Sequence, residues 1–188
     1  MTRRVLPVAL FAFAFVVPGC IGGDDRIEEE AVAAVEGFDP ARPDSMDRLN
    51  QVVARGGDVI SVLEPFVAGP DPIRTWAALY VVALLADSES DADVLAPLLL
   101  DPDPANRVIA AGSLAGLGRK DALPVLIQGL GAEAALPYTD PPRSAADLAA
   151  EALVAYTAES FATPEAWRSW WDGVGERLRW DGERYVLD

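Results

Sequence analysis

The chain has 188 residues, with 15 Lys or Arg, 30 Asp or Glu and no His, so its net charge is −15. A chain this acidic repels phosphate backbones and anionic headgroups, which argues against a nucleic-acid partner. Because histidine is absent and Cys20 is the single cysteine, Ser-His-Asp catalysis and zinc sites built on His or Cys are excluded, and we expect no catalytic residue, no metal site and no cofactor.

The N-terminal segment has the composition of an export signal. Positions 3 and 4 are arginines, and an apolar run over residues 5–17 follows, which is too short to span a bilayer. Cys20 directly follows a small residue, and residues 17–20 resemble the lipobox of bacterial lipoproteins, although Pro18 stands where Ala or Ser is more usual. The resemblance implies cleavage before Cys20, whose thiol would then carry the lipid anchor. The alternative is an unmodified thiol at the end of an uncleaved anchor.

These features divide the beginning of the chain into two predicted segments. Residues 1–19 are expected to be a lipoprotein signal peptide, and residues 20–45 a lipidated cysteine followed by a flexible acidic tether. Gly, Asp, Glu and Pro are frequent in this second segment, and residues 37–45 read as extended chain. Residues 26–36 are compatible with a helical turn or two.

From residue 46 onward, apolar residues recur at helical spacing. Residues 46–53 and 59–67 predict a first, degenerate pair of helices. Asp71-Pro72 then has the pattern of a helix start, with an N-cap aspartate and a proline in the first turn. Small and apolar residues follow this start at helical spacing, and the apolar residues of 94–99 predict the partner helix: Ala77, Ala78, Val81, Leu84, Val94, Leu95, Leu98 and Leu99.

An acidic loop separates these two segments. Residues 87–93 carry acidic side chains at alternate positions, as calcium-binding loops do. The loop lacks the glycine at its sixth position, and Leu98 stands where a calcium loop has its bidentate glutamate. We therefore favour a solvated, helix-capping loop over a calcium site.

Residues 101–130 contain the clearest helix-turn-helix unit. Asp103 is a good N-cap with Pro104 in the first helical turn, and Gly118 is placed to end the helix in the left-handed conformation. Asp121 then predicts the N-cap of a second helix. Arg107 follows Arg74 by 33 positions, and the small and apolar residues after each arginine keep the same offsets.

A third opening of this kind begins at Asp140. Two registers fit the helix that follows. Counting four residues from Arg143 reaches Asp147, which departs from the pattern, whereas a register from Ala146 places small, apolar or aromatic side chains at helical spacing: Ala149, Ala150, Leu153 and Tyr156. Both registers lie on one helical face, so either predicts a helix.

Together these units resemble HEAT repeats, in particular the short bacterial form shared with phycobilisome-lyase-like repeats. The resemblance covers about residues 71–157 and implies an all-α fold, a short α-solenoid, with residues 46–162 as the repeat domain. In that family the aspartate and the arginine of each repeat usually link it to the next repeat through hydrogen bonds. For this chain the resemblance implies that role for Asp71, Arg74, Asp103 and Arg107.

Residues 163–188 predict an aromatic helix followed by a β-hairpin. Thr163 and Pro164 mark the helix start, and Trp167, Trp170 and Trp171 fall on one helical face. Residues 179–187 alternate around an Asp-Gly pair, which is typical of a hairpin. We favour a cap that closes the end of the solenoid. The alternative is an aromatic surface that binds sugars.

Three classes of function follow from the sequence. The first is a lipid-anchored scaffold or adaptor of the bacterial cell envelope, on the periplasmic or extracellular face of the cell membrane or outer membrane, that binds another envelope protein or peptide. The second is glycan or cell-wall binding through the C-terminal tryptophans. The third, an enzyme resembling the chromophore lyases, is disfavoured because histidine is absent, Cys20 is assigned to lipid and the export signal removes the chain from a cytoplasmic substrate.

Overall fold

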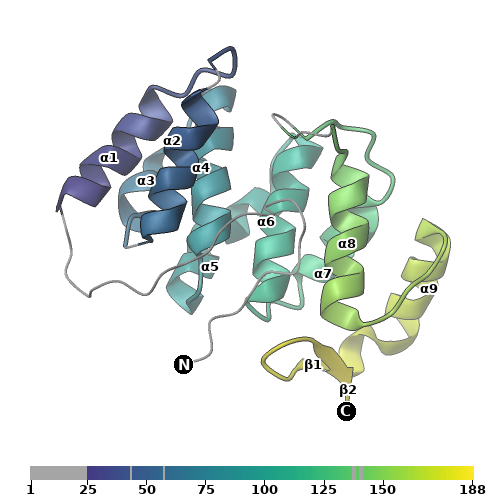
Figure 1. Ribbon diagram of the computed structural model, residues 1–188. Helices are drawn as coiled ribbons and strands as arrows, with labels where there is room; N and C mark the ends of the chain where they lie inside the picture. Colours follow the sequence, from purple (N-terminus) through teal and green to yellow (C-terminus); the bar gives the residue numbers. More distant parts are fainter. Residues whose placement is uncertain (1–24, 43, 57, 137–138, 140–141) are drawn as a thin grey trace. The chain divides into compact units, whose positions relative to one another are not determined.

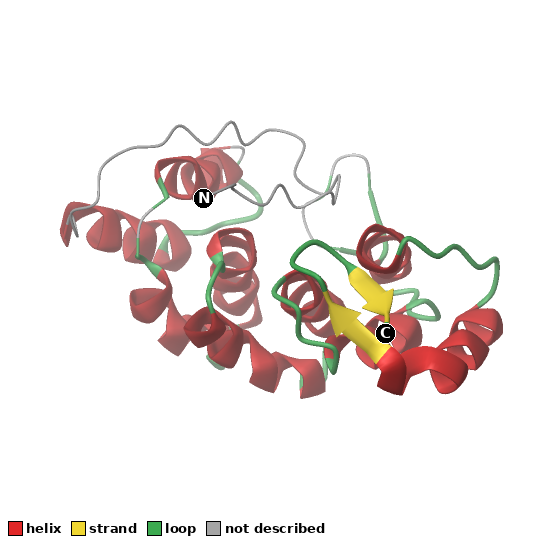
Figure 2. Cartoon of the chain, turned by 90° about the horizontal axis from the view of Figure 1, so that it is seen from below, coloured by secondary structure: helices red, strands yellow, loops and turns green. Residues whose placement is uncertain are grey.

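The computed structural model describes residues 25–42, 44–56, 58–136, 139 and 142–188, so the predicted signal peptide and Cys20 lie outside the described residues. The described chain is mostly helical, with one small antiparallel sheet near its C-terminal end (Figures 1 and 2). This confirms the predicted helical fold with a C-terminal hairpin. Among the described residues, helices are too short or too polar to cross a bilayer.

The described chain forms two compact units, which divide between residues 94 and 95. This division differs from the predicted single repeat domain over residues 46–162. The first unit extends further toward the N-terminus, and the C-terminal helix and hairpin belong to the second. The helices that build the first unit are α1 (Asp25–Glu36), α2 (Asp44–Arg55), α3 (Ile60–Val67), α4 (Pro72–Leu85) and most of α5 (Glu89–Leu95).

Helix α4 is the centre of the first unit. Every residue from Thr75 to Ala83 is buried, and α1, α2 and α3 all contact this helix. The predicted start is confirmed, because the Asp71 carboxylate accepts hydrogen bonds from the backbone N–H groups of Ile73 and Arg74. A helix that is buried all round needs neighbours on several sides, and the N-terminal helices supply them.

The described residues of 25–45 form a helix longer than the predicted turn or two, followed by a short loop, in place of a flexible tether. Helix α1 buries Ala31, Ala34 and Val35 against the unit, and Phe38, just beyond it, packs on Trp76 with ring centroids 5.4 Å apart. These four apolar residues lie at helical or near-helical spacing, so burial offsets the cost of ordering the polar residues between them.

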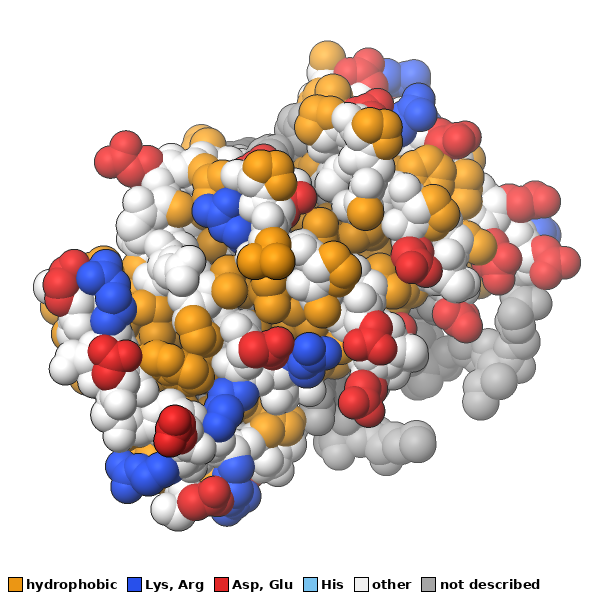
Figure 3. Space-filling model, turned by 180° about the vertical axis from the view of Figure 1, so that it is seen from behind, with side chains coloured by type: hydrophobic (Ala, Val, Ile, Leu, Met, Phe, Trp, Pro, Cys, Tyr) orange, Lys and Arg blue, Asp and Glu red, His pale blue; other side chains and the backbone are white. Residues whose placement is uncertain are grey.

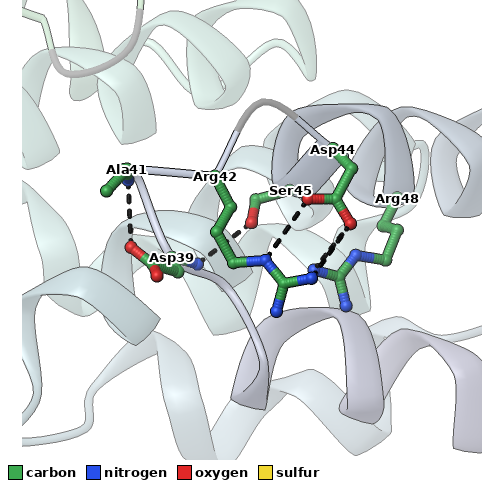
Figure 4. A network of polar contacts seen from close by, with 6 residues as sticks. All are labelled: Asp39, Ala41, Arg42, Asp44, Ser45 and Arg48. Carbon is green, nitrogen blue, oxygen red and sulfur yellow. Dashed lines mark hydrogen bonds and ion pairs between the residues drawn. The ribbon is translucent and has the colours of Figure 1, made fainter.

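The loop between α1 and α2 is closed by the polar contacts shown in Figure 4. The Asp39 N–H donates to Ser45 Oγ at 3.2 Å, and the Asp39 carboxylate accepts from the Ala41 N–H at 2.9 Å. Asp44, the first residue of α2, forms ion pairs with Arg42 and Arg48, each at 3.4 Å. The described residues of this loop are therefore held by polar contacts between two packed helices.

The described residues of the second unit, Leu95–Asp188, form four α-helices, two short 3₁₀ helices and the hairpin. Helix α6 is its centre and contacts η2, α7 and α8, while the hairpin strands pair antiparallel with Trp180 opposite Tyr185. The elements are η2 (Ala96–Leu100), α6 (Pro104–Gly116), α7 (Ala122–Gly129), α8 (Ala145–Thr157), α9 (Pro164–Val174), η3 (Gly175–Arg177), β1 (Leu178–Trp180) and β2 (Tyr185–Leu187).

The predicted partner helix over residues 94–99 is interrupted in the structure. Helix α5 ends at Leu95, and η2 continues as a 3₁₀ turn that packs on α6. Pro97 stands in the first turn of η2 and lacks the N–H that would continue the α-helical ladder. The apolar spacing identified the buried Leu95 and Leu98, whereas the proline determines the break.

The helix ends in the second unit test the predicted caps. Gly118 has φ +85°, and the Arg119 N–H donates to the Leu114 carbonyl at 2.9 Å, so the predicted left-handed end of α6 is confirmed. Asp121 does precede α7, but its backbone is helical and its side chain makes no capping bond. Its carboxylate instead pairs with Arg119 at 3.2 Å, which removes it from the capping position.

Helix α8 begins at Ala145, later than the Asp140 opening predicts. Ser144 Oγ accepts from the Asp147 N–H at 3.1 Å, and the Asp147 carboxylate accepts from the Ser144 N–H at 2.8 Å. Asp147 departed from the repeat pattern because it belongs to this capping box. The buried face of α8 includes Ala149, Leu153 and Tyr156, as the second register predicts, together with Ala145, Leu148 and Ala152. Ala146 and Ala150, which that register also places on this face, are half-buried.

Candidate functional site

The four residues predicted to link successive repeats make local contacts among the described residues. Arg74 pairs with Asp71 at 3.4 Å, so both stabilise the start of α4. Asp103 accepts from the Ala105 N–H at 2.8 Å as the N-cap of α6. Arg107 Nη1 donates to the carbonyls of Asp101 and Pro102, at 2.7 and 3.1 Å. In each case, the contacts given above lie at the start of a helix, α4 or α6.

The acidic loop before α5 is a helix cap. Ser88 Oγ accepts from the Asp91 N–H at 3.2 Å, and the Asp91 carboxylate accepts from the N–H groups of Asp87 and Ser88 at 3.0 and 3.1 Å. This reciprocal arrangement is a capping box, in agreement with the helix-capping loop that the sequence interpretation favours. Within the described part of the chain, acidic and cysteine side chains form no group of three arranged to hold a metal ion.

The three tryptophans of α9 have different environments. Trp167 is 3% exposed and packs edge-to-face on Phe161 and on Trp170, with ring centroids 4.9 and 5.6 Å apart. Trp171 covers Gly175, where an added Cβ would lie 2.8 Å from the indole ring. Trp167 is therefore a core residue of the second unit, whereas Trp170 and Trp171 are half-buried.

The hairpin docks on the turn between α6 and α7. Tyr185 Oη donates to the Ala115 carbonyl at 3.3 Å, and Lys120 Nζ donates to the carbonyls of Glu176 and Leu178, each at 3.2 Å. Burial raises the pKa of the Tyr185 hydroxyl. The Trp180 ring lies against the same turn, at Gly118. These contacts support the predicted role of the C-terminal segment as a cap on the helices.

A four-residue turn joins the two strands. The Asp181 N–H donates to the Arg184 carbonyl at 3.1 Å, and the Asp181 carboxylate accepts from the N–H groups of Glu183 and Arg184, both at 2.9 Å. These backbone hydrogen bonds hold the pKa of Asp181 below its usual value. The predicted Asp-Gly pair thus forms the turn, with Gly182 at φ +108°.

An open cavity of about 240 Å³ lies between the hairpin, the end of α8 and the Trp170 side chain of α9. Trp170 is the predicted aromatic residue that reaches it. Ala158 contributes a backbone in the left-handed conformation, with φ +58°, which is uncommon for a residue other than glycine. The residues that line the cavity are Thr157, Ala158, Glu159, Trp170, Leu178, Arg184, Tyr185, Val186 and Leu187.

The cavity combines apolar walls with two opposite charges. Leu187 is 50% exposed, and Glu159 and Arg184 are exposed side chains that form no ion pair with each other. Sequence reasoning missed Ala158, Glu159 and Arg184, because they join this site only after α8 ends beside the hairpin. The arrangement has the chemistry of a binding site: an aromatic ring, aliphatic side chains and a few polar groups.

The first unit contains a broader depression of about 540 Å³ along α1 and α3. Its charged lining is entirely acidic and consists of Asp25, Glu28, Glu29 and Glu36. These carboxylates lie on the solvent side of a helix whose opposite face is packed. On the molecular face shown in Figure 3, acidic, basic and hydrophobic side chains are interspersed.

The cavity beside the hairpin is therefore the best-defined candidate site among the described residues. It brings together one sequence-predicted residue, Trp170, and excludes Trp167, which is used in the core. Comparisons with protein-family models, with curated proteins and with solved structures found no match to this chain.

Proposed function

We propose that this chain is a lipid-anchored binding scaffold of the bacterial cell envelope. Its helical hairpins would form a short α-solenoid, and Cys20 would carry the anchor. The binding partner is another envelope protein or peptide, and the chain performs no catalysis. The complete absence of histidine and the single cysteine in the sequence support a binding role over an enzymatic one.

The observation that carries the scaffold proposal is the shared construction of α4 and α6. Each helix begins with an Asp-Pro cap, at Asp71 and Asp103, and each is buried over most of its length. Helix α4 packs against the shorter helix α3, which precedes it in the chain, and α6 packs against the shorter helix α7, which follows it. Repeated helical pairs of this kind bury a shared core and leave their outer surfaces for binding.

The anchor is tested by replacing Cys20 with serine in the full-length chain. We expect the wild-type protein to sediment with membranes and Cys20→Ser to lose the lipid, which mass spectrometry of the mature N-terminus would detect. Normal acylation of Cys20→Ser would contradict the proposed anchor. The substitution leaves residues 25–188 unchanged, so the circular dichroism spectrum serves as the control for folding.

The scaffold role is tested by photo-crosslinking from single positions. Ile73 on α4 and Val154 on α8 are large apolar side chains with 40% and 45% exposure, so a photoreactive residue at either site probes a helix surface. We expect a reproducible protein partner, identified by mass spectrometry, from at least one position. Gly173, which has open space around its Cα, is the matched control position. Equal crosslinking from all three positions would contradict a specific scaffold.

Glycan binding is the second candidate, and the position of Trp170 favours it. Its half-buried ring lines the cavity with Glu159 and Arg184, and aromatic rings stack on the apolar faces of sugars. If this candidate is right, the protein should be retained on purified peptidoglycan, and Trp170→Ala should abolish retention. Retention that is unchanged in Trp170→Ala would contradict it. Trp171→Ala is the control, because Trp171 does not line the cavity.

A further inference from the structure

The apolar surface at the cavity continues onto α8. Thr157 and Ala158, at and just beyond the end of this helix, line the cavity. Val154 precedes them by three and four positions, so it lies on the same helical face. The Ala158 N–H donates to the Val154 carbonyl at 3.0 Å, which places these two residues on successive turns. Because Val154 is 45% exposed and Leu187 in the cavity lining is 50% exposed, two large apolar side chains reach the surface here.

The cavity has the size of one side chain. Its volume of about 240 Å³ is below the roughly 300–1,000 Å³ of pockets that enclose small-molecule ligands. Its walls include the ring of Trp170 and the aliphatic side chains of Leu178, Val186 and Leu187. Pockets of this kind hold the buried anchor residues of protein interfaces. Size and walls together therefore fit an apolar side chain of a partner protein.

The backbone of the partner segment favours a helix. An extended segment needs hydrogen bonds from an accessible strand edge. The hairpin gives no such edge at the cavity, because Leu178 of β1 and Tyr185 of β2 are 5% and 2% exposed. A helix bonds its own backbone groups internally and contacts a surface through side chains alone. Its side chains three or four positions apart are separated by about 5–6 Å, the same spacing that relates Val154 to the cavity-lining Ala158 on α8.

The charges near this surface favour a basic partner. Both charged residues of α8, Asp147 and Glu151, are acidic, and Glu151 is paired with Arg143. Glu159 lines the cavity together with the basic Arg184, and the two form no ion pair with each other. The net charge of −15 attracts cationic segments and repels anionic ones, which include a second copy of this chain.

We propose that the surface formed by Val154 and the cavity binds a basic amphipathic helix of a partner protein. One apolar side chain of that helix enters the cavity against Trp170 and Leu187, a second one packs on Val154, and a basic side chain faces Glu159. The inference rests on the proposed scaffold function and names its surface and the kind of partner. Figure 1 shows α8 with the hairpin near its lower end, where the cavity lies.

The probe is a phage-displayed library of random 16-residue peptides, selected on the folded wild-type protein. We expect enriched peptides to carry apolar residues three or four positions apart and an excess of Lys and Arg. Fluorescence anisotropy of one labelled peptide then gives its affinity for each variant. Val154→Lys and Leu187→Lys should each weaken binding at least about tenfold, because a charged side chain replaces an apolar contact. Ile73→Lys is the matched control, since Ile73 is a 40% exposed apolar residue of the first unit, and it should weaken binding less than about threefold.

Two charged residues of the cavity lining test the sign of the partner's charge. Glu159→Gln should weaken binding about two- to fivefold, as for an exposed ion pair, whereas Arg184→Gln should leave binding unchanged or strengthen it. Both substitutions keep the apolar walls and replace one exposed charge with an amide. The circular dichroism of the complex should show helix gained by the peptide.

Four results would overturn the inference. They are a selection without enriched peptides, equal losses for Val154→Lys and Ile73→Lys, a bound peptide that gains no helix, and a loss confined to Arg184→Gln. The circular dichroism spectrum of each variant before peptide addition serves as the control for folding.

Two other occupants give different results, and each would also overturn it. Chitohexaose that binds with loss on Trp170→Ala and no change on Val154→Lys would assign the cavity to glycan. Concentration-dependent dimers that Leu187→Lys dissociates would assign the surface to a second copy of this chain. Failure here leaves the scaffold proposal standing if Ile73 still crosslinks to a partner, since Ile73 belongs to the first unit and does not line the cavity.

Discussion

Gly118 shows how strongly a single position can be constrained. Its φ of +85° lies in the left-handed region, and an added Cβ would lie 2.7 Å from the Trp180 ring. The glycine therefore serves two purposes: it ends α6, and it allows the hairpin to dock. The position of the glycine in the sequence predicted the end of α6. The docking of the hairpin could not be predicted in this way, because it depends on Trp180, which lies far away along the chain.

We expect Gly118→Ala to lower the free energy of unfolding by about 2–4 kcal/mol. Left-handed strain contributes about 1–2 kcal/mol, and displacement of the Trp180 ring adds about 1–3 kcal/mol. Urea denaturation followed by tryptophan fluorescence measures this change. Gly173→Ala is the control, since Gly173 lies in α9 with nothing within 4 Å, and it should increase stability by up to about 1 kcal/mol. Equal effects at both sites would contradict the role given to Gly118.

The Ser144–Asp147 capping box gives a pH-dependent prediction. Hydrogen bonds from the Ser144 backbone and side chain lower the pKa of Asp147 from 3.8, and Arg143 lowers it further. Because the pKa of Asp147 is lower in the folded state than in the unfolded state, the ionised carboxylate stabilises the fold at pH values above the unfolded-state pKa. This stabilisation is lost as the pH falls through the folded-state pKa. Asp147→Asn should therefore be destabilising at pH 7, and this effect should decrease as the pH falls and the carboxyl group becomes protonated. Thermal unfolding of both proteins over a series of pH values below 7 measures the difference.

Ser144→Ala separates the cap itself from the charge. Loss of an N-cap side chain costs about 1 kcal/mol, so Ser144→Ala should lower stability by about that amount at pH 7. Combining it with Asp147→Asn should give less than the sum of the two single effects, because the two residues bond to each other. Strict additivity would show that the box does not act as a unit.

At the scale of elements, the C-terminal segment owes its stability to α9 as much as to the hairpin. Trp167 on α9 is buried among aromatic rings, α9 packs on α7, and the hairpin is tied to the α6–α7 turn by Lys120 and Tyr185. The segment is therefore an integral part of the second unit.

This packing predicts unequal effects for two adjacent tryptophans. Trp167→Ala should lower the free energy of unfolding by about 3–5 kcal/mol, the usual cost of removing a buried large aromatic side chain. Trp170→Ala should cost distinctly less, because one side of its ring faces the cavity. Chemical denaturation compares the two variants. A larger loss for Trp170→Ala would show that Trp170 is the core residue and would remove it from the candidate site.

The elements also show which features can be predicted from sequence. Helix starts at Asp71, Asp103 and Thr163 were predictable because each cap bonds to its own first turn. Asp121 had the same local pattern, yet its side chain pairs with Arg119. Local sequence identifies a residue that is able to cap, whereas the competing partner decides whether it does.

Long-range contacts account for what the sequence missed. Helix α1 read as part of a tether because its mean composition is polar, and only the position of α4 shows where Ala31, Ala34 and Val35 are buried. The candidate site was partly predictable: Trp170 was identified from its helical face. Glu159 and Arg184 have no local signal, and the cavity that joins them exists only when α8, α9 and β2 come together.

At the scale of the whole molecule, acidic charge dominates. The sequence has 30 acidic and 15 basic side chains, so ion pairs such as Arg143–Glu151, at 2.5 Å, and Arg55–Glu30 still leave an excess of 15 negative charges. Mutual repulsion among the remaining carboxylates destabilises the compact state. Salt screens exposed charges over a Debye length of about 10 Å at 0.1 M.

We therefore expect the melting temperature to rise by a few degrees between 10 and 150 mM NaCl at pH 7, a change that corresponds to about 1 kcal/mol for a chain of this size. The effect should diminish near the isoelectric point of about 4.2, where net repulsion vanishes. Scanning calorimetry at the two salt concentrations and two pH values measures it. A melting temperature that falls with salt at pH 7 would show that ion pairs outweigh repulsion.

The contact of Lys120 with the hairpin also has a consequence for labelling chemistry. Lys120 is the only lysine in the sequence. Its amino group donates hydrogen bonds to the backbone carbonyls of Glu176 and Leu178. Reagents that acylate lysine side chains therefore have one target in this chain, and reaction there would remove two of the hydrogen bonds that dock the hairpin. Lysine-directed crosslinking and fluorophore coupling would thus alter the end of the molecule that lies nearest the candidate site, whereas carboxylate-directed or photochemical reagents would leave it intact.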